Sequence, residues 1–418
     1  MKILQVSQAD HSGGAERIAH DLHRCSLAAG HDSRMLVGYK RGIDPTVTSL
    51  VPESGLGRFA YRCVRALERY SGAQAQLYWM AGSWLRRNIQ GWDVIHLHNV
   101  HGQYFNLGLL PLLSRHSRVI FTLHDCWLFT GHCAYVFDCN KWTDDCHPCC
   151  DIARYPGMER DAAGYNLRRK KDIFSKARPL LITPSQWLCD LVQKSAIFRD
   201  FDCRVIYNGI DTTKFCRGDK SAARSRLRLP ADKFVILYVV NGGLNSTSYK
   251  DPDLLLAALQ RLLAGPIAGR FHLVVVGGKK HISSQFEPFV SQVEDTREGL
   301  EAFYQAADIL VYPTKADNCP LVPMEAMSCG LPVVSTRIGG VPEVVEHGVT
   351  GYVTEPGDAR EFAEAITAIL SSESMLASMS MASVQRVEER FSLQGMTRAY
   401  FDLYQEKREG IRDKECSR

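Results

Sequence analysis

Asp317 and Glu325, two carboxylates eight positions apart, stand where a strand predicted at 309–312 gives way to a helix. Pro320 suits the first turn of that helix, where its missing N–H is no loss, and Gly330 marks the end of the helix. A helix N-terminus after a strand favours phosphate, because its N–H groups point at the ligand. The carboxylates instead suit sugar hydroxyls, so the segment predicts a site for a nucleotide sugar.

A lysine at the start of another predicted helix could complement this segment. Lys250 directly precedes Asp251, which suits an N-cap, and Pro252, which suits the first helical position. A lysine in this place could offset the charge of a diphosphate without a metal ion. A solvated lysine is the commoner explanation of the position alone, so the assignment depends on the carboxylates at 317 and 325.

His124 follows an apolar run, 119–123, in the first half of the chain. Such parallel sheets bind their ligands at the carboxyl ends of the strands. A histidine there could contact a substrate phosphate or hydroxyl. A hydrogen-bonded histidine at a strand end explains the sequence equally well.

Cysteines are concentrated in one short stretch, where six of the 14 fall between Cys126 and Cys150. Four thiolates could close a tetrahedral structural zinc site and order a loop that has little else to bury. The spacing favours this set: Cys133, Cys139, Cys146 and Cys149. Packed free thiols or an oxidised pair are the alternatives, since only the last two form Cys-x-x-Cys.

Length and composition set limits on the class of protein. A chain of 418 residues with 45% hydrophobic and 23% charged residues predicts two globular domains. The net charge of +4 gives no reason to expect a nucleic-acid partner. The N-terminus resembles a strand and not a signal peptide, and we see no run apolar enough to span a bilayer. We therefore expect a cytoplasmic protein with reduced thiols.

Apolar runs suited to strands recur along the chain, at 2–6, 35–37, 94–98, 119–123, 180–183, 234–240, 271–276 and 309–312. Helical patterns lie between several of them, which predicts parallel strands covered on both faces. We expect an α/β protein with two successive Rossmann-like, doubly wound domains at 1–205 and 206–392. The first would carry the cysteine-rich loop 126–150. The segment 393–418 is expected to form a helix that crosses back to the first domain.

Pairs of glycines follow three of the predicted strands, at Gly13-Gly14, Gly242-Gly243 and Gly277-Gly278. None of them extends to Gly-x-Gly-x-x-Gly, so a nicotinamide dinucleotide fingerprint is absent from the sequence. An ordinary turn explains each pair taken singly. Their recurrence at strand ends favours ligand-binding turns.

A basic run, Arg168–Lys171, precedes two apolar residues. It could contact anionic lipid as a peripheral membrane patch. A solvated helix face is the commoner explanation of such a run.

Taken together, these residues resemble those of the family 4 retaining glycosyltransferases, which have the GT-B fold of two Rossmann-like domains facing a cleft. The resemblance covers nearly the full length. It rests on Gly13–Arg17, Thr122–Asp125, Ile182–Ser185, Asn208–Asp211, Lys250 and Glu325–Pro332. The run His124–Cys133 with the later cysteines is similar to a subgroup from exopolysaccharide clusters, including colanic-acid-type transferases.

The resemblance implies a role for each matched position. Glu325 would bind the ribose hydroxyls of the donor, and Lys250 would neutralise its diphosphate. Asp317 takes the place of the family's first Glu, near the donor sugar, and His124 would lie near the reacting sugar. The implied donor-binding set also includes Gly13, Gly14, Gly243, Asn318, Cys319, Pro320 and Leu321.

Two departures from the family pattern stand out. The usual Glu-(seven residues)-Glu is here Asp-(seven residues)-Glu, so contacts to the sugar would shift by a methylene length. The arginine that often precedes the lysine is absent from 241–248, where Asn245 or Ser246 could replace it.

The resemblance implies transfer of a sugar from a UDP- or GDP-linked donor to a saccharide or lipid-linked acceptor in exopolysaccharide biosynthesis. Retention at the anomeric carbon is implied, with no cofactor required for catalysis. A lipid-linked acceptor would place the protein at the inner face of the cytoplasmic membrane. A nucleotide-sugar epimerase and a non-catalytic sugar-nucleotide-binding protein are the alternatives.

Overall fold

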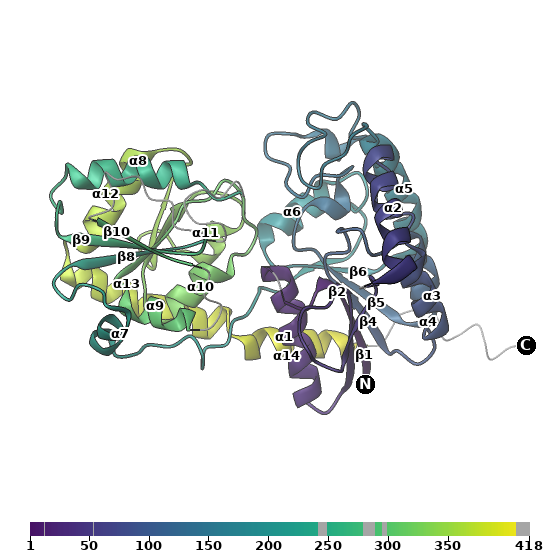
Figure 1. Ribbon diagram of the computed structural model, residues 1–418, viewed down its shortest axis with the longest axis horizontal. Coiled ribbons are helices and arrows are strands. Elements are labelled where there is room, and N and C mark those ends of the chain that lie inside the picture. Colours follow the sequence, from purple (N-terminus) through teal and green to yellow (C-terminus); the bar gives the residue numbers. More distant parts are fainter. Residues whose placement is uncertain (12, 53, 241–248, 279–288, 295–298, 407–418) are drawn as a thin grey trace, which may run out of the picture. The chain divides into compact units, whose positions relative to one another are not determined.

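The computed structural model describes residues 1–406 apart from 12, 53, 241–248, 279–288 and 295–298, and divides them into two compact units (Figure 1). The first unit comprises Met1–Ile206 together with the described residues from Thr397 onward, and the second comprises Tyr207–Met396. The sequence predicts limits at 205 and 393. Each unit is built around its own parallel sheet.

The first unit has a seven-stranded sheet in the order β3-β2-β1-β4-β5-β6-β7. All neighbouring strands pair in parallel. The strands are β1 (Lys2–Ala9), β2 (Asp32–Tyr39), β3 (Val47–Ser49), β4 (Val94–Leu97), β5 (Arg118–Thr122), β6 (Leu180–Thr183) and β7 (Cys203–Val205).

Helices cover both faces of this sheet, with α1 and α14 on one face and α4 and α5 on the other (Figure 1). The helices are α1 (Gly14–Ala28), α2 (Gly55–Ser71), α3 (Trp79–Arg87), α4 (Leu110–His116), α5 (Ala163–Ala177), α6 (Gln186–Lys194) and α14 (Leu393–Gln405). Short 3-10 turns lie at Leu107–Leu109, Trp127–Phe129 and Lys141–Thr143.

A buried chain of hydrogen bonds fixes the end of α14 to the first unit. Tyr404 Oη lies 2.7 Å from His96 Nδ1 and accepts from Gln5 Nε2 at 3.2 Å. His96 Nε2 lies 2.7 Å from Thr122 Oγ1, which in turn lies 2.9 Å from Tyr400 Oη. Buried polar groups are costly when unpaired, so these contacts specify where the helix docks on the strands.

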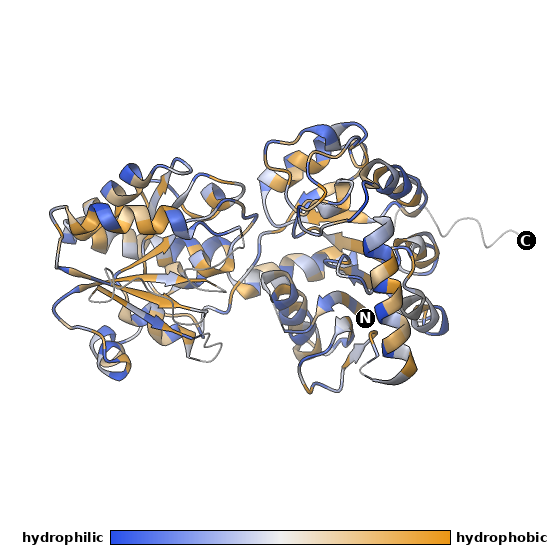
Figure 2. Ribbon diagram, turned by 45° about the horizontal axis from the view of Figure 1, so that its top comes forward, coloured by the Kyte–Doolittle hydropathy of each residue, from blue (hydrophilic) through white to orange (hydrophobic). Residues whose placement is uncertain are grey.

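The second unit has a six-stranded sheet in the order β10-β9-β8-β11-β12-β13, again parallel throughout. Its strands are mostly orange in Figure 2, as expected for strands covered on both faces. They are β8 (Phe234–Val239), β9 (Phe271–Val276), β10 (Val290–Val293), β11 (Ile309–Tyr312), β12 (Val333–Thr336) and β13 (Gly351–Thr354).

The helices of the second unit are α7 (Lys220–Leu227), α8 (Pro252–Leu263), α9 (Leu300–Ala306), α10 (Leu321–Ser328), α11 (Val341–Val344), α12 (Ala359–Leu370) and α13 (Glu373–Arg390). Among them, α8 and α12 carry an apolar stripe on one side and polar residues on the other, whereas α10 is almost wholly buried. Asp251 caps α8, accepting from Leu254 N at 3.3 Å, and Pro252 opens the helix as predicted. No helix among the described residues is long and apolar enough to cross a membrane.

One buried carboxylate ties α7 to the sheet of the second unit. Asp308, which directly precedes β11, accepts from Arg224 Nη2 at 2.6 Å and from Lys220 Nζ at 2.9 Å. It also accepts from Val235 N at 2.7 Å. Asp308 and Arg224 are both buried, so each needs the other to compensate for its lost hydration.

We therefore expect Asp308→Ala to lower the free energy of unfolding by about 3 kcal/mol or more, because Arg224 would remain buried without its carboxylate. Glu355→Ala is the matched control, since the Arg337–Glu355 pair at 3.0 Å is exposed. Its cost should stay below about 1 kcal/mol. Urea denaturation measures both, and equal costs would show that the Asp308 cluster is no stronger than a surface pair.

Candidate active site

Lys250 is held by backbone bonds between its own segment and the loop that follows β11. Lys315 N donates to Tyr249 O at 2.7 Å, and Asp251 N donates to Pro313 O at 3.1 Å. Lys250 itself forms an isolated antiparallel bridge with Thr314. These bonds place the start of α8 beside the loop from β11 to α10.

The ammonium group of Lys250 pairs directly with the first predicted carboxylate. Its Nζ lies 2.6 Å from Asp317 Oδ2 and 4.1 Å from the centre of the Tyr312 ring. The hydroxyl of Tyr312 donates to the same Asp317 oxygen at 2.6 Å. The two charged side chains are each about one-fifth exposed, at 20% for Lys250 and 19% for Asp317. The predicted cation and carboxylate therefore form one partly shielded cluster.

The backbone around Asp317 leaves little freedom to this cluster. Asn318 N donates to Asp317 Oδ1 at 2.9 Å, and Gly340 N donates to Asp317 O at 3.2 Å. Gly339 has a φ of +56°, and a Cβ there would lie 2.0 Å from Asp317 O. Only glycine fits at 339 without displacing the carboxylate.

Helix α10 begins and ends close to the predicted limits. Pro320 is its N-cap, and Gly330, with a φ of +85°, follows its C-terminus. Asn318, Cys319 and Pro320 are buried, and Leu321 is half-buried. The Cys319 carbonyl accepts from Asn208 Nδ2 at 3.0 Å, which ties the loop to the start of the second unit.

Glu325 lies inside α10 and is only 2% exposed. Its Oε2 accepts from the Tyr304 hydroxyl of α9 at 2.7 Å. The second predicted carboxylate is therefore buried and oriented by a tyrosine, in contrast to Asp317. Its role at the ribose stays a prediction.

Of the glycines predicted to bind the donor, the structure describes Gly13 and Gly14 but not Gly243. Gly13 is the N-cap of α1, and its N–H donates to Glu16 Oε2 at 3.0 Å. Gly14 is the first residue of the helix. Gly243, Asn245 and Ser246 lie outside the described residues.

His124 belongs to a stack of histidines at the carboxyl ends of β4 and β5. Its Nε2 lies 3.0 Å from His98 Nδ1, and the two rings stack with centres 5.3 Å apart. Burial lowers the pKa of His124 to about 4 and the pKa of His98 well below 6.5. Both rings are neutral at pH 7. His98 Nε2 donates to Gln5 Oε1, so His98 Nδ1 accepts and His124 Nε2 carries the hydrogen.

The predicted four-cysteine zinc set is not assembled. No group of three or more histidine, cysteine or acidic side chains in the described ranges is arranged to hold a metal ion. Cys139 Sγ instead lies 2.9 Å from Cys150 Sγ. Cys133 and Cys149 both approach His132 Nε2, at 3.4 and 3.1 Å, and Cys146 Sγ accepts from a backbone N–H. Zinc binding by these cysteines stays an untested prediction, and we assign no step to zinc.

The basic run 168–171 is not a free surface patch. Lys170 is buried, donates to Thr130 O at 2.9 Å, and lies 3.7 Å from the centre of the Trp127 ring. Burial lowers the pKa of Lys170 to about 7. Arg169 is half-buried against backbone carbonyls, so only Arg168 and Lys171 are exposed. Helical spacing turns the middle two charges inward.

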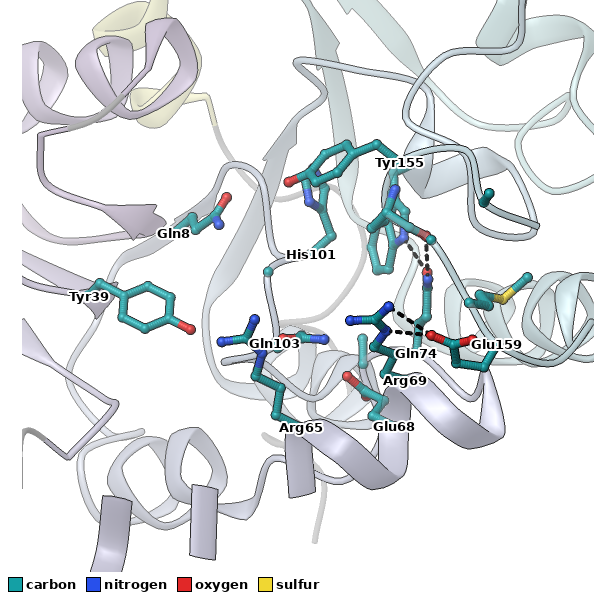
Figure 3. A pocket seen from close by; sticks show the side chains of 17 residues that line it. Gln8, Tyr39, Arg65, Glu68, Arg69, Gln74, His101, Gln103, Tyr155 and Glu159 are labelled. Carbon is teal, nitrogen blue, oxygen red and sulfur yellow. Dashed lines mark hydrogen bonds and ion pairs between the residues drawn. The ribbon is translucent and has the colours of Figure 1, made fainter. Parts of the chain in front are cut away.

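A pocket of about 690 Å³ opens in the first unit, at the carboxyl ends of its strands (Figure 3). Three side chains of α2 project into it, opposite His101 and Tyr155 (Figure 3). Its polar and aromatic lining consists of Gln8, Tyr39, Arg65, Glu68, Arg69, Gln74, His101, Gln103, Trp127, Tyr155 and Glu159. Aromatic faces with amides and charged groups are suited to binding a polar ring such as a sugar.

One residue that lines this pocket, His101, is held by a carboxylate. His101 Nε2 lies 2.7 Å from Asp125 Oδ2, while its Nδ1 is buried and has no hydrogen-bond partner among the described residues. Because the carboxylate only accepts, Nε2 carries hydrogen. Asp125 is itself oriented by Trp127 N, which donates to Oδ1 at 2.8 Å. The pair therefore holds the imidazole ring of His101 in a fixed orientation at the pocket wall.

The sequence predictions did not include this pocket. His101 follows β4 as His124 follows β5, so the rule that selected one histidine could have selected both. The contribution of α2 had no comparable signal, because its residues lie far along the chain from the strands that they face.

Two family models match the chain. "Glycosyltransferase Family 4" matches residues 12–214, and "Glycosyl transferases group 1" matches residues 233–372. The chain is therefore a glycosyltransferase of the GT-B type, with one model on each half.

Relatives and solved structures agree with this assignment. The chain is 27% identical over 375 residues to WcaC of Escherichia coli (strain K12), a glycosyl transferase assigned to colanic acid biosynthesis, covering 85% of this chain and 88% of WcaC. It is 34% identical over 223 residues to D-inositol 3-phosphate glycosyltransferase 2 of Catenulispora acidiphila, about half of each chain (49% and 50%).

Among solved structures, sucrose-phosphate synthase of Thermosynechococcus elongatus superposes with a TM-score of 0.69 and 19% identity, over 97% of this chain and 98% of that one. Anabaena HepE in complex with UDP gives 0.66 and 19%, over 96% and 99%. At these identities the structures support the fold alone.

One pocket residue gives a pH-dependent prediction. Glu68 is buried, and burial raises its pKa from 4.5 to about 7 although Gln76 N donates to it at 3.1 Å. The folded chain then keeps a proton that the unfolded chain loses above pH 4.5. The free energy of unfolding therefore falls as pH rises through this window.

We expect Glu68→Gln, which keeps the shape and the accepting oxygen, to remove this fall. Its stability relative to the natural chain should rise by about 3 kcal/mol between about pH 4.5 and about pH 8. Urea denaturation at a series of pH values measures the difference. Parallel pH profiles for the two proteins would contradict a buried carboxyl at 68.

Proposed function

We propose that this chain transfers a hexosyl group from a nucleotide sugar, held by the second unit, to a saccharide held by the pocket of the first unit. The observation that carries the proposal is the Lys250–Asp317–Tyr312 cluster beside the loop that enters α10. It combines a cation for a diphosphate with a carboxylate for hydroxyl groups. HepE is known with UDP and with UDP-glucose, so a UDP-linked sugar is the first donor to test.

The proposed step breaks the bond between the anomeric carbon and the diphosphate oxygen of the donor. A hydroxyl oxygen of the acceptor forms the new bond on the same face, with retention, and its proton passes to the departing phosphate. Negative charge grows on the diphosphate as the bond breaks, and the Lys250 ammonium together with the N–H groups at the start of α10 would stabilise it. Glu325 would hold the ribose.

The pocket of the first unit favours transfer over epimerisation. An epimerase acts on one ligand. This chain has, besides the Lys250–Asp317 cluster of the second unit, a polar and aromatic pocket of about 690 Å³ in the first unit. His101, held by Asp125, lines this pocket, where a sugar could pack against its ring. Similarity to WcaC supports an acceptor from surface polysaccharide biosynthesis.

Lys250→Ala tests the donor site. We expect release of UDP from a UDP-sugar to fall at least roughly a hundredfold, because the developing charge loses its cation. Lys315→Ala is the matched control, since Lys315 is on the neighbouring segment, is half exposed at 54% and pairs with Asp251 at 3.4 Å. It should keep near-natural turnover.

Circular dichroism and thermal unfolding would show that both variants are folded. Near-natural turnover by folded Lys250→Ala would remove the lysine from the mechanism. The failure of every UDP- and GDP-sugar to raise the melting temperature of the natural chain would contradict the donor site itself.

His101→Asn tests the acceptor pocket. We expect the KM for an accepted saccharide, found by screening mono- and disaccharides, to rise roughly tenfold while the KM for the donor is unchanged, because the variant loses uniform binding to one substrate. His116→Asn, at an exposed position on α4, is the control. An effect on the donor KM alone would place His101 outside acceptor binding.

A further inference from the structure

Helix α2 exposes a continuous apolar stripe. Leu56 is 88% exposed, Phe59 66%, Leu67 56% and Tyr70 74%, and Cys63 between them is also exposed. Spacings of three and four residues place all five on one side of the helix. Large apolar side chains gathered on a surface usually mark an interaction site.

The same helix turns little apolar surface inward. Within Gly55–Ser71 only Tyr61 and Glu68 are buried. A helix that only covered a core would have the opposite pattern, with its leucines and phenylalanine inward. The folding of the unit therefore does not explain the stripe.

A column of arginines runs beside the stripe, with about one per turn: Arg58, Arg62, Arg65 and Arg69. Arg58 and Arg62 are exposed, Arg65 and Arg69 line the pocket, and Arg69 pairs with Glu159 at 2.7 Å. The one acidic residue of the helix, Glu68, is buried. The outer surface of α2 is therefore apolar and basic, with no acidic residue on it.

We propose that α2 lies on the surface of a bilayer that contains anionic phospholipid. The stripe from Leu56 to Tyr70 would enter the boundary between headgroups and acyl chains, and Arg58 and Arg62 would meet the lipid phosphates. Apolar burial combined with basic charge is the chemistry by which an amphipathic helix binds such a surface. The basic charge beside the stripe complements the anionic headgroups of phospholipid, which is the occupant that this helix fits.

The position of α2 connects this surface to the acceptor pocket. Glu68 and Arg69 project from α2 into the pocket (Figure 3), while the side chains of the apolar stripe are exposed to solvent. Lipid bound at the stripe would lie one helix diameter from the pocket wall, about 10 Å. This geometry suits a saccharide that is itself linked to a lipid. That last point rests on the proposed function.

Vesicle flotation of the full chain tests the proposal. Vesicles of phosphatidylcholine alone are compared with vesicles that also contain phosphatidylglycerol, at low and high salt. We expect binding to the phosphatidylglycerol vesicles that weakens with salt. The affinity of the double variant Phe59→Ser/Leu67→Ser for these vesicles should fall at least roughly tenfold. The affinity of Arg58→Ser/Arg62→Ser should also fall roughly tenfold.

Two controls match these variants. Met381→Ser changes an exposed apolar residue of α13, 62% exposed, in the second unit. Arg168→Ser/Lys171→Ser removes two exposed basic charges of α5. Both should bind vesicles like the natural chain.

Three outcomes would overturn the proposal: no binding of the natural chain, equal binding by the stripe variant, or a self-associated natural chain that the stripe variant converts to a monomer without any vesicle binding. Donor-induced stabilisation is measured in parallel. If donors do not stabilise the natural chain, the proposed function is contradicted but the vesicle result stands. The proposed function and the membrane proposal can therefore fail separately.

Discussion

Both units obey one constraint, which is that the described strands pair in parallel and the central ones are buried on both faces. A strand buried on both faces can offer chemistry only where it ends, and in a parallel sheet all of the carboxyl ends share one edge. In the first unit that edge carries His101, His124 and the pocket. In the second it carries Lys250 and Asp317, brought together by backbone bonds between the loops that follow β8 and β11. The units thus use the same geometry for two kinds of ligand.

Eight of the 13 described strands and several helix limits could be predicted because their signals are local. The apolar runs at 180–183 and 309–312 coincide with β6 and β11, since nearly continuous burial leaves an unbroken apolar sequence. Asp251 and Pro252 fixed the start of α8 for stereochemical reasons that act within one turn. The candidate donor residues were found for the same reason, because they lie on the turns between such elements.

Long-range pairing and orientation could not be predicted. Lys250 and Asp317 are far apart in sequence, and no rule of spacing says that the ammonium and the carboxylate share Tyr312. The run 168–171 shows the converse problem, because four neighbouring charges look alike until the helix turns Lys170 into the core. Nearness in sequence also gave no information about which thiols would face each other, since Cys139 lies against Cys150, outside the predicted set. Helix α2 was not predicted as an interaction surface. Its apolar residues face outward, whereas an apolar periodicity in a sequence is normally assigned to the side of a helix that faces the core.

The Lys250–Asp317 contact has a consequence for competition in a phosphate-rich solution. The ammonium is already neutralised by a carboxylate at 2.6 Å, so any anion that takes the lysine must displace or share a partner held by two hydrogen-bond donors. An ion anchored at a single point, such as inorganic phosphate, gains little from that exchange. A ligand that also binds elsewhere in the unit can compensate for it with its other contacts. Asp317 therefore favours ligands that bind the unit at several points over ions that bind only the lysine.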